Sequence, residues 1–220
     1  MFYKLYFILL ILIYKYTLSY YLLQRYTNHN LRNKNLPKKY FSNKITKKLL
    51  INNYTYDIYN GEKVYYLHKI SIEHIYPKSM LKNEARKDMH NLYLTSKYYN
   101  NHRSNYKYVN EKYFNTLNSH ILCLDNNCDN LKSNTFGIYI PYNYSRGKIS
   151  RAIAYMNLIY PNMCYVKTIN EFLLNIEILK EWNNNYPPDY EEIERNNIIK
   201  NYQGNCNPFI SNYKLINYLL

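Results

Sequence analysis

The chain has 220 residues and a formal net charge of +14, with 31 tyrosines and only 4 glycines. This length suits one domain with a sizeable core, or a smaller domain with extensions, and the absence of internal repeats argues against a repeat array. The four cysteines are scattered without paired CxxC knuckles, which argues against a structural zinc site. The excess of Tyr, Asn and Lys is typical of an AT-rich genome, so single residues of these types carry little information.

Most of the positive charge lies near the N-terminus. Ten of the 29 basic residues precede Asp57, the first acidic residue, which leaves 19 basic and 15 acidic residues and a net charge of +4 from that point onward. The body of the chain is therefore only mildly basic. Such a charge permits binding to phosphate without requiring it.

Residues 1–19 are typical of a signal peptide. The apolar run Leu5–Tyr14 has the length of a signal-peptide core and is too short for a bilayer, which needs roughly 20 residues. The small residues Thr17 and Ser19 predict cleavage after Ser19. An uncleaved membrane anchor over Leu5–Leu23 is the alternative.

Residues 20–53 form a basic arm without acidic residues and with little periodicity, so we expect a mobile segment. Its composition is also similar to that of an organellar transit peptide behind a signal sequence, which would suit a plastid. Codon bias alone is the competing explanation. We expect the protein in the secretory pathway, with the extracellular space, a vacuole or a plastid lumen as its destination.

From residue 54 to residue 220 the pattern predicts a single folded domain. β-prone runs over 54–59 and 64–67 flank the turn signal Asn60-Gly61 and predict a hairpin. Residues 106–140 are expected to be mixed loop and short strand.

A strand is expected over Ile70–His74, ending near Pro77, and Thr95-Ser96 can cap a short helix. That helix would carry Asn100 and Arg103 on one face, because residues three apart are neighbours on a helix surface.

The C-terminal third predicts three helices. An apolar face at helical spacing marks the first, formed by Ile149, Ala152, Ile153, Met156 and Ile159. The second is expected to begin in a capping box of Thr168 and Glu171 and to end before Pro187. The third is expected to begin at Asp189 and to end by Gly204. The predicted fold class is α+β, with a hairpin-and-helix module packed on a helical half.

If the chain is secreted, the four cysteines suggest disulfides with three pairings. The short loop between Cys123 and Cys128 makes them the favoured pair. Four unpaired thiols are the alternative.

The residues around the predicted strand end suggest phosphodiester hydrolysis. A neutral histidine with one nitrogen fixed can take a proton from water, and Mg²⁺ on one or two protein oxygens can act as a Lewis acid. We predict His74 as the general base, Glu73 and Asn100 as Mg²⁺ ligands and Arg103 as a phosphate contact, with Ca²⁺ or Mn²⁺ as substitutes. Neighbours on a strand point to opposite faces, so Glu73 and His74 share a site only where the strand ends or bulges. An isolated Glu-His pair is usually structural, and Asp88 also has a structural interpretation.

The segments Ser71–Pro77, Lys87–Leu92 and Asn100–Asn105 resemble the bacterial endonuclease I family of secreted or periplasmic nucleases. The resemblance covers roughly residues 65–212 and continues through Ser145–Met156, Glu181–Pro187, Glu194–Ile199 and Gln203–Phe209. It implies a His-Me finger (ββα-metal) fold and a Mg²⁺-dependent, sequence-non-specific endonuclease acting on DNA, with RNA as a second candidate. It also implies products with 5′-phosphate and 3′-hydroxyl ends.

In this resemblance His74 matches the general base, Glu73 and Asn100 match the metal ligands, and Arg103 matches an arginine of the same helical motif. A further set of polar residues matches recurrent family positions, for which phosphate contact and structural support are both open. This substrate-binding set is Arg146, Arg151, Arg195, Gln203 and Asn205.

The chain departs from the family pattern at two places. Asn101-His102 replaces a more usual glycine and an acidic or small residue. The stretch between His74 and Asp88 lacks an insertion found in some relatives. Any role of an arginine in that insertion therefore does not transfer to this chain, and Arg86 is the candidate to replace it. The expected partner is nucleic acid, which a monomer of the protein would bind through the sugar-phosphate backbone. One alternative is a catalytically inactive binding or uptake protein that keeps the fold. A further alternative is a membrane-tethered nuclease.

Overall fold

The computed structural model describes residues 54–65, 70–111, 121–160 and 175–219, together with four isolated residues before position 22. The predicted signal peptide and basic arm therefore lie almost entirely outside the described residues, as do the Thr168 capping box and Cys164. In the described ranges, no helix is both long and apolar enough to cross a membrane.

The module that carries the predicted site consists of two antiparallel strands and a helix, β3 (Ile70–His74), β4 (Leu92–Ser96) and α3 (Lys97–Arg103). The strand predicted over residues 70–74 is confirmed. So is the helix cap, because the Ser96 side chain accepts a hydrogen bond from the backbone N–H of Tyr99. The helix begins directly at the end of β4, which brings it back over β3.

Three short 3₁₀ turns connect β3 to β4, namely η1 (Lys78–Met80), η2 (Asn83–Lys87) and η3 (Met89–Asn91). Asp88 precedes η3 and caps it by accepting a hydrogen bond from the backbone N–H of His90 at 3.0 Å. Asn91 fixes the chain after β3, because its side chain exchanges two hydrogen bonds with the backbone of Tyr76.

The predicted hairpin is present as two very short strands, β1 (Thr55–Tyr56) and β2 (Lys63–Val64). Gly61 in the turn has a φ of 70°, a conformation that glycine adopts without a steric penalty. Asp57 ties this hairpin to the site module, because its buried carboxylate accepts hydrogen bonds from Thr95 Oγ1 and from the backbone N–H of Ser96.

A separate four-stranded sheet has the order β5-β8-β7-β6, in which β5 runs parallel to β8 and the other pairs are antiparallel. Its strands are β5 (Lys107–Tyr108), β6 (Leu122–Cys123), β7 (Leu131–Ser133) and β8 (Ile138–Ile140). The favoured cysteine pair, Cys123 and Cys128, forms a disulfide beside β6, while Cys206 has a free thiol.

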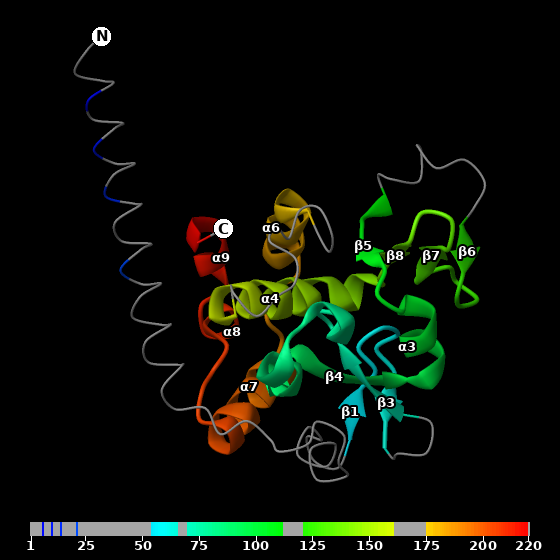
Figure 1. Cartoon of the computed structure of the whole chain (residues 1–220), viewed down its shortest axis with the longest axis horizontal. Helices are drawn as coiled ribbons and strands as arrows, with labels where there is room; N and C mark the ends of the chain where they lie inside the picture. Colours follow the sequence, from blue (N-terminus) through cyan, green and yellow to red (C-terminus); the bar gives the residue numbers. More distant parts are fainter. Residues whose placement is uncertain are drawn as a thin grey trace.

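The helical half is built around α4 (Asn143–Ile159), which crosses the centre of the molecule between the site module and α6 (Figure 1). The other helices are α6 (Ile176–Asn185), α7 (Tyr190–Gln203), α8 (Pro208–Ser211), the 3₁₀ turn η5 (Tyr213–Leu215) and α9 (Ile216–Leu219). The mixture of helices and short strands is compatible with the predicted α+β class.

The prediction for α4 was incomplete. Its expected apolar face is buried, but so are polar residues on the rest of the helix, including Ser145, Lys148 and Ser150. The helix is enclosed because the turn η3, α6 and α8 all contact it. A helix in that position must satisfy its polar side chains within the protein.

The third predicted helix, α7, is confirmed at both ends. Asp189 caps it by accepting from the backbone N–H of Glu192 at 2.8 Å, and Gly204 ends it in the left-handed conformation with a φ of 92°. The second helix was predicted to begin at Thr168, but α6 begins at Ile176, because Asn175 has an extended backbone and its side chain caps the helix by accepting from the backbone N–H groups of Glu177 and Ile178. Its predicted end before Pro187 is confirmed.

Candidate active site

A cleft opens where the C-terminal end of β3 meets α3. Its lining includes all four residues predicted for catalysis and metal binding, Glu73, His74, Asn100 and Arg103. His74 is the last residue of β3, so the predicted strand end explains how two neighbouring side chains reach one cleft.

Glu73 lies at the inner wall of the cleft and is only 2% exposed. Its Oε1 atom lies 2.8 Å from the hydroxyl of Tyr59, which donates a hydrogen bond, and 3.0 Å from Nη1 of Arg103. The Tyr59 hydroxyl in turn lies 2.8 Å from that of Tyr108. Burial raises the pKa of Glu73 to about 7, while the Arg103 charge and the Tyr59 hydrogen bond oppose this rise.

Arg103 does not reach outward to a phosphate, as the sequence suggested. Its side chain is 1% exposed, and besides Glu73 it donates to the backbone carbonyls of His74 at 3.0 Å and Ile75 at 2.6 Å. The guanidinium also lies 4.5 Å from the centre of the Tyr108 ring. Both terminal nitrogens therefore hold the end of β3 and its carboxylate in place, which gives Arg103 a positioning role, and its phosphate contact stays a prediction.

The imidazole of His74 is oriented by a backbone carbonyl, with Nε2 3.0 Å from the carbonyl oxygen of Arg86. A carbonyl only accepts hydrogen bonds, so Nε2 carries the proton of the neutral ring and Nδ1 carries the lone pair. Burial lowers the pKa of His74 to about 4, which keeps the ring neutral near pH 7.

Arg86 contributes to the site through its backbone. Its Nε donates to the carbonyl of Leu81 at 2.6 Å, which closes the turn between β3 and β4. The side chain is not part of the cleft lining. The suggestion that Arg86 replaces an arginine of the missing insertion is therefore not supported by its position.

Asn100 lines the same cleft from α3 and is anchored through its amide nitrogen. Nδ2 donates to Ser71 Oγ at 2.5 Å and to the carbonyl of Ile72 at 3.2 Å, so the amide is held with a defined orientation against β3. A donor set of one carboxylate and one amide oxygen fits a hard cation such as Mg²⁺, which takes few protein ligands and retains waters. Among the described residues, no group of three or more His, Cys, Asp and Glu side chains is arranged to hold a metal ion.

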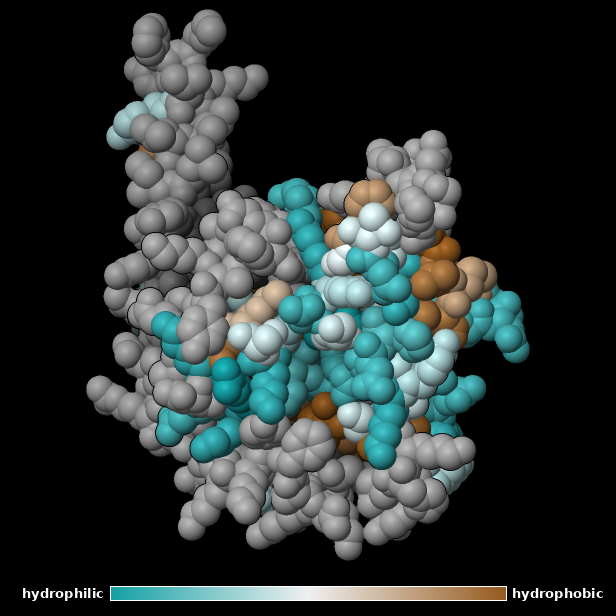
Figure 2. Space-filling model, turned by 45° about the vertical axis from the view of Figure 1, so that its right-hand side comes forward, coloured by the Kyte–Doolittle hydropathy of each residue, from teal (hydrophilic) through white to brown (hydrophobic). Residues whose placement is uncertain are grey.

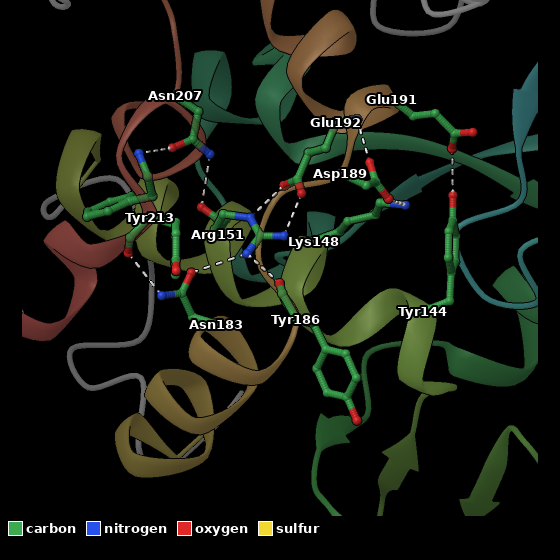
Figure 3. Close-up of polar contacts among 11 residues, drawn as sticks. Tyr144, Lys148, Arg151, Asn183, Tyr186, Asp189, Glu191, Glu192, Asn207 and Tyr213 are labelled. Carbon is green, nitrogen blue, oxygen red and sulfur yellow. Dashed lines mark hydrogen bonds and ion pairs between the residues drawn. The ribbon is translucent and has the colours of Figure 1, made fainter.

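Two of the arginines predicted to bind substrate are buried in ion pairs instead. Arg151 is 1% exposed; its Nε and Nη2 donate to the two carboxylate oxygens of Glu192 at 2.8 and 2.5 Å, and Nη1 donates to Asn183 and to the carbonyl of Tyr186 (Figure 3). Arg146 pairs with Glu111 and donates to the carbonyl of Pro141.

The third arginine, Arg195, extends from α7 under the site module. Its Nη2 donates to the carbonyls of Met89 at 2.6 Å and Leu92 at 2.5 Å, and its guanidinium lies 3.8 Å from the centre of the Tyr93 ring. These contacts fix the turn before β4 to α7.

Gln203 and Asn205 belong to a buried polar cluster around Asp88. The Asp88 carboxylate accepts from Gln203 Nε2 at 2.9 Å and from the hydroxyls of Tyr155 and Tyr160 at 2.8 and 2.7 Å. Asn205 donates to the Tyr155 hydroxyl at 2.7 Å.

This cluster joins the site module to α4 and to the end of α7. None of the five residues of the predicted substrate-binding set lines the cleft. Their contacts favour the structural interpretation, and their binding to substrate stays a prediction.

Comparison with known protein families gives one match over most of the chain. A family model described as Endonuclease I matches residues 13–214, a range that contains the whole cleft and the helical half. A search of curated proteins finds no match. Because the family match covers most of the chain, the protein belongs to the endonuclease I family, a family of nucleases.

Proposed function

We propose that the protein is a Mg²⁺-dependent, sequence-non-specific endonuclease that hydrolyses phosphodiester bonds in DNA, with RNA as a second substrate. The observation that carries the proposal is a cleft in which two antiparallel strands and the following helix bring together a carboxylate, a neutral imidazole and an anchored amide. We assign this β3-β4-α3 unit to the His-Me finger (ββα-metal) class. Glu73 and Asn100 would hold the cation.

In the proposed reaction His74 acts as the general base. Nδ1 takes a proton from a water molecule, and the oxygen of that water attacks the phosphorus while the bond to the 3′ oxygen breaks. The 3′ oxygen then takes up a proton, which leaves a 5′-phosphate and a 3′-hydroxyl. A bound Mg²⁺ supplies Lewis-acid stabilisation of the phosphate charge and of the departing oxygen.

The surrounding residues support these roles by position and charge. The Arg86 carbonyl holds the His74 tautomer and accepts the Nε2 hydrogen bond before and after proton transfer. An approaching phosphate anion raises the pKa of His74 from its low value, because a neighbouring negative charge favours the imidazolium. Tyr59 and Arg103 keep the Glu73 carboxylate at the cleft wall.

We test the function by comparing plasmid cleavage by the purified protein with and without Mg²⁺. His74→Ala is expected to reduce the rate by about 10²- to 10⁴-fold, the usual contribution of a general base. The matched control is His102→Ala, because His102 is a partly exposed α3 residue that lies outside the cleft lining. Its ring contacts that of Tyr98 edge to face, with the ring centres 4.4 Å apart.

Equal rates for His74→Ala and the parent would refute the assignment of the base. DNA binding by the parent without turnover would instead support a catalytically inactive binding protein.

We also propose that residues 1–19 direct the protein into the secretory pathway and are removed, and that the mature protein is a monomer. The Cys123–Cys128 disulfide favours an oxidising compartment, because cytosolic thiols are kept reduced. N-terminal sequencing of protein isolated from its source should give Tyr20 as the first residue. An intact N-terminus in a membrane fraction would indicate an uncleaved anchor.

A further inference from the structure

The side-chain amide of Asn100 has two chemically different ends. Its oxygen is an acceptor of the kind that binds a hard cation, whereas its nitrogen carries two N–H donors. The two ends have nearly the same size and shape, so packing alone does not select between them. Whether Asn100 can serve as a metal ligand therefore depends on the hydrogen bonds that orient its amide.

The contacts of the amide nitrogen fix this orientation. Nδ2 lies 2.5 Å from Oγ of Ser71 and 3.2 Å from the carbonyl oxygen of Ile72, and it donates a hydrogen bond to each. A carbonyl only accepts hydrogen bonds, so the nitrogen and not the oxygen is directed at β3. In the part of the chain that the structure describes, Oδ1 of Asn100 has no hydrogen-bond partner. The oxygen is therefore the end that remains for a ligand.

Ser71 is placed for this contact by β3. It is the second residue of the strand, and the alternation of side chains puts it on the same face as Glu73, two residues further on. Both residues line the cleft. A hydrogen bond to Ser71 therefore anchors the Asn100 amide on the face of β3 that carries the carboxylate.

The bond to Ser71 is the shorter of the two bonds that the amide nitrogen makes, and solvent competes with it. Asn100 is half-buried on α3, and the face of the molecule on the α3 side is largely hydrophilic (Figure 2). Without the Ser71 hydroxyl the amide would keep only the longer bond to the Ile72 carbonyl, and water would compete for the freed N–H. The oxygen would then no longer be held in one direction.

We propose that Ser71 is a positioning residue for the cation site, which holds the amide nitrogen of Asn100 against β3 and so leaves the amide oxygen to a hard cation such as Mg²⁺. This proposal rests on the proposed nuclease function. Ser71 touches a ligand of the cation rather than the cation itself. Replacing a residue that is hydrogen-bonded to a metal ligand typically lowers metal affinity by about 10- to 100-fold.

Three variants of Ser71 and one control separate this role from a general effect on the fold. Ser71→Ala removes the acceptor, whereas Ser71→Thr keeps a hydroxyl on a side chain that suits a strand. Ser71→Cys places a thiol, which is a weak acceptor, at the same position. The control is Ser79→Ala, because Ser79 lines the same cleft from η1 and is not among the described hydrogen-bond partners of Asn100.

The first measurement is Mg²⁺ binding to the purified protein by calorimetry, with circular dichroism to confirm the fold. Ser71→Ala is expected to weaken binding by about 10- to 100-fold, and Ser71→Cys to weaken it to a smaller extent. Ser71→Thr and Ser79→Ala should stay near the parent value. Equal affinities of Ser71→Ala and the parent, or an equal loss in Ser79→Ala, would overturn the proposal. A lower Tm with unchanged affinity would also overturn it, because a merely structural serine gives that result.

The second measurement is the dependence of plasmid cleavage on Mg²⁺ concentration. A misdirected amide lowers the affinity for the cation but not the reactivity of the occupied site. Ser71→Ala should therefore need about 10- to 100-fold more Mg²⁺ for half-maximal cleavage and reach a similar maximal rate. A lower maximal rate with unchanged half-saturation would overturn the proposal. A parent protein that binds Mg²⁺ but cleaves nothing would instead refute the proposed function, and the calorimetric comparison would still decide the role of Ser71.

Discussion

Replacing Arg151 by methionine should destabilise the fold and leave substrate binding intact. The guanidinium forms a two-pronged ion pair with Glu192 between α4 and α7, and both side chains are almost completely buried. Its remaining terminal nitrogen donates to Asn183 at 3.2 Å and to the carbonyl of Tyr186 at 2.9 Å. Arg151→Met leaves the Glu192 carboxylate buried without its counter-charge.

Breaking a buried ion pair in this way typically costs about 3–5 kcal/mol. For a protein of about 150–250 residues, 1 kcal/mol corresponds to a Tm change of roughly 2–4 °C. The expected decrease in Tm is therefore about 6–20 °C. Arg151→Met/Glu192→Leu should recover part of this loss, because the second change removes the unpaired charge.

The assay is thermal and urea unfolding of both variants, with DNA binding measured on the folded protein. Lys180→Met is the control, since Lys180 pairs at 3.9 Å with Glu177, whose side chain is 84% exposed. This substitution should change the free energy of unfolding by less than about 1 kcal/mol. If Arg151→Met unfolds like the parent but binds DNA more weakly, Arg151 is a substrate contact and the structural assignment is wrong.

Three further predictions concern the site and the disulfide. Tyr59→Phe removes the hydroxyl that donates to Glu73 and should weaken Mg²⁺ binding, measured by calorimetry, by about 10- to 100-fold. Tyr139→Phe should leave the affinity unchanged because the Tyr139 hydroxyl donates to Asn130, and equal affinities of the two variants would exclude this role of Tyr59. Burial raises the pKa of metal-free Glu73 to about 7, so protons should compete with the cation below pH 7. The Mg²⁺ affinity should fall about tenfold per pH unit below pH 7 and stay constant above it, and a pH-independent affinity between pH 5 and 7 would contradict this. Replacing both Cys123 and Cys128 by serine should lower the free energy of unfolding by about 2 kcal/mol, the loss of chain entropy expected for a five-residue separation. An unchanged midpoint of urea unfolding would show that other contacts hold the loop.

Features set by short-range spacing could be predicted from the sequence. Strand β3, the Ser96 cap and the placement of Asn100 and Arg103 on α3 follow from local propensity and helical periodicity. The capped helix α7 was predictable for the same reason, because its start and stop signals lie within the segment itself.

The direction of long polar side chains could not be predicted in this way. Arginine can bind a phosphate, a carboxylate or a carbonyl, so the sequence suggested a phosphate contact for Arg103 and left phosphate contact and structural support both open for Arg151. In the fold, Arg103 pairs with Glu73 and Arg151 with Glu192. Tyr59 was missed because one tyrosine among 31 gives no signal in the sequence.

The sequence by itself determined that Glu73 and His74 lie at a strand end and that Asn100 and Arg103 share a helix face, because these features depend on neighbours within one strand or one helical turn. The packing of α3 on β3 brings the two pairs into one cleft. Only the tertiary structure decided which polar groups face solvent and which are used inside the fold. Asp88 illustrates the reason, since its hydrogen-bond partners Gln203, Tyr155 and Tyr160 lie more than sixty residues away in the chain. A buried polar group must find a partner wherever the packed helices place one, and that choice is made by the whole fold.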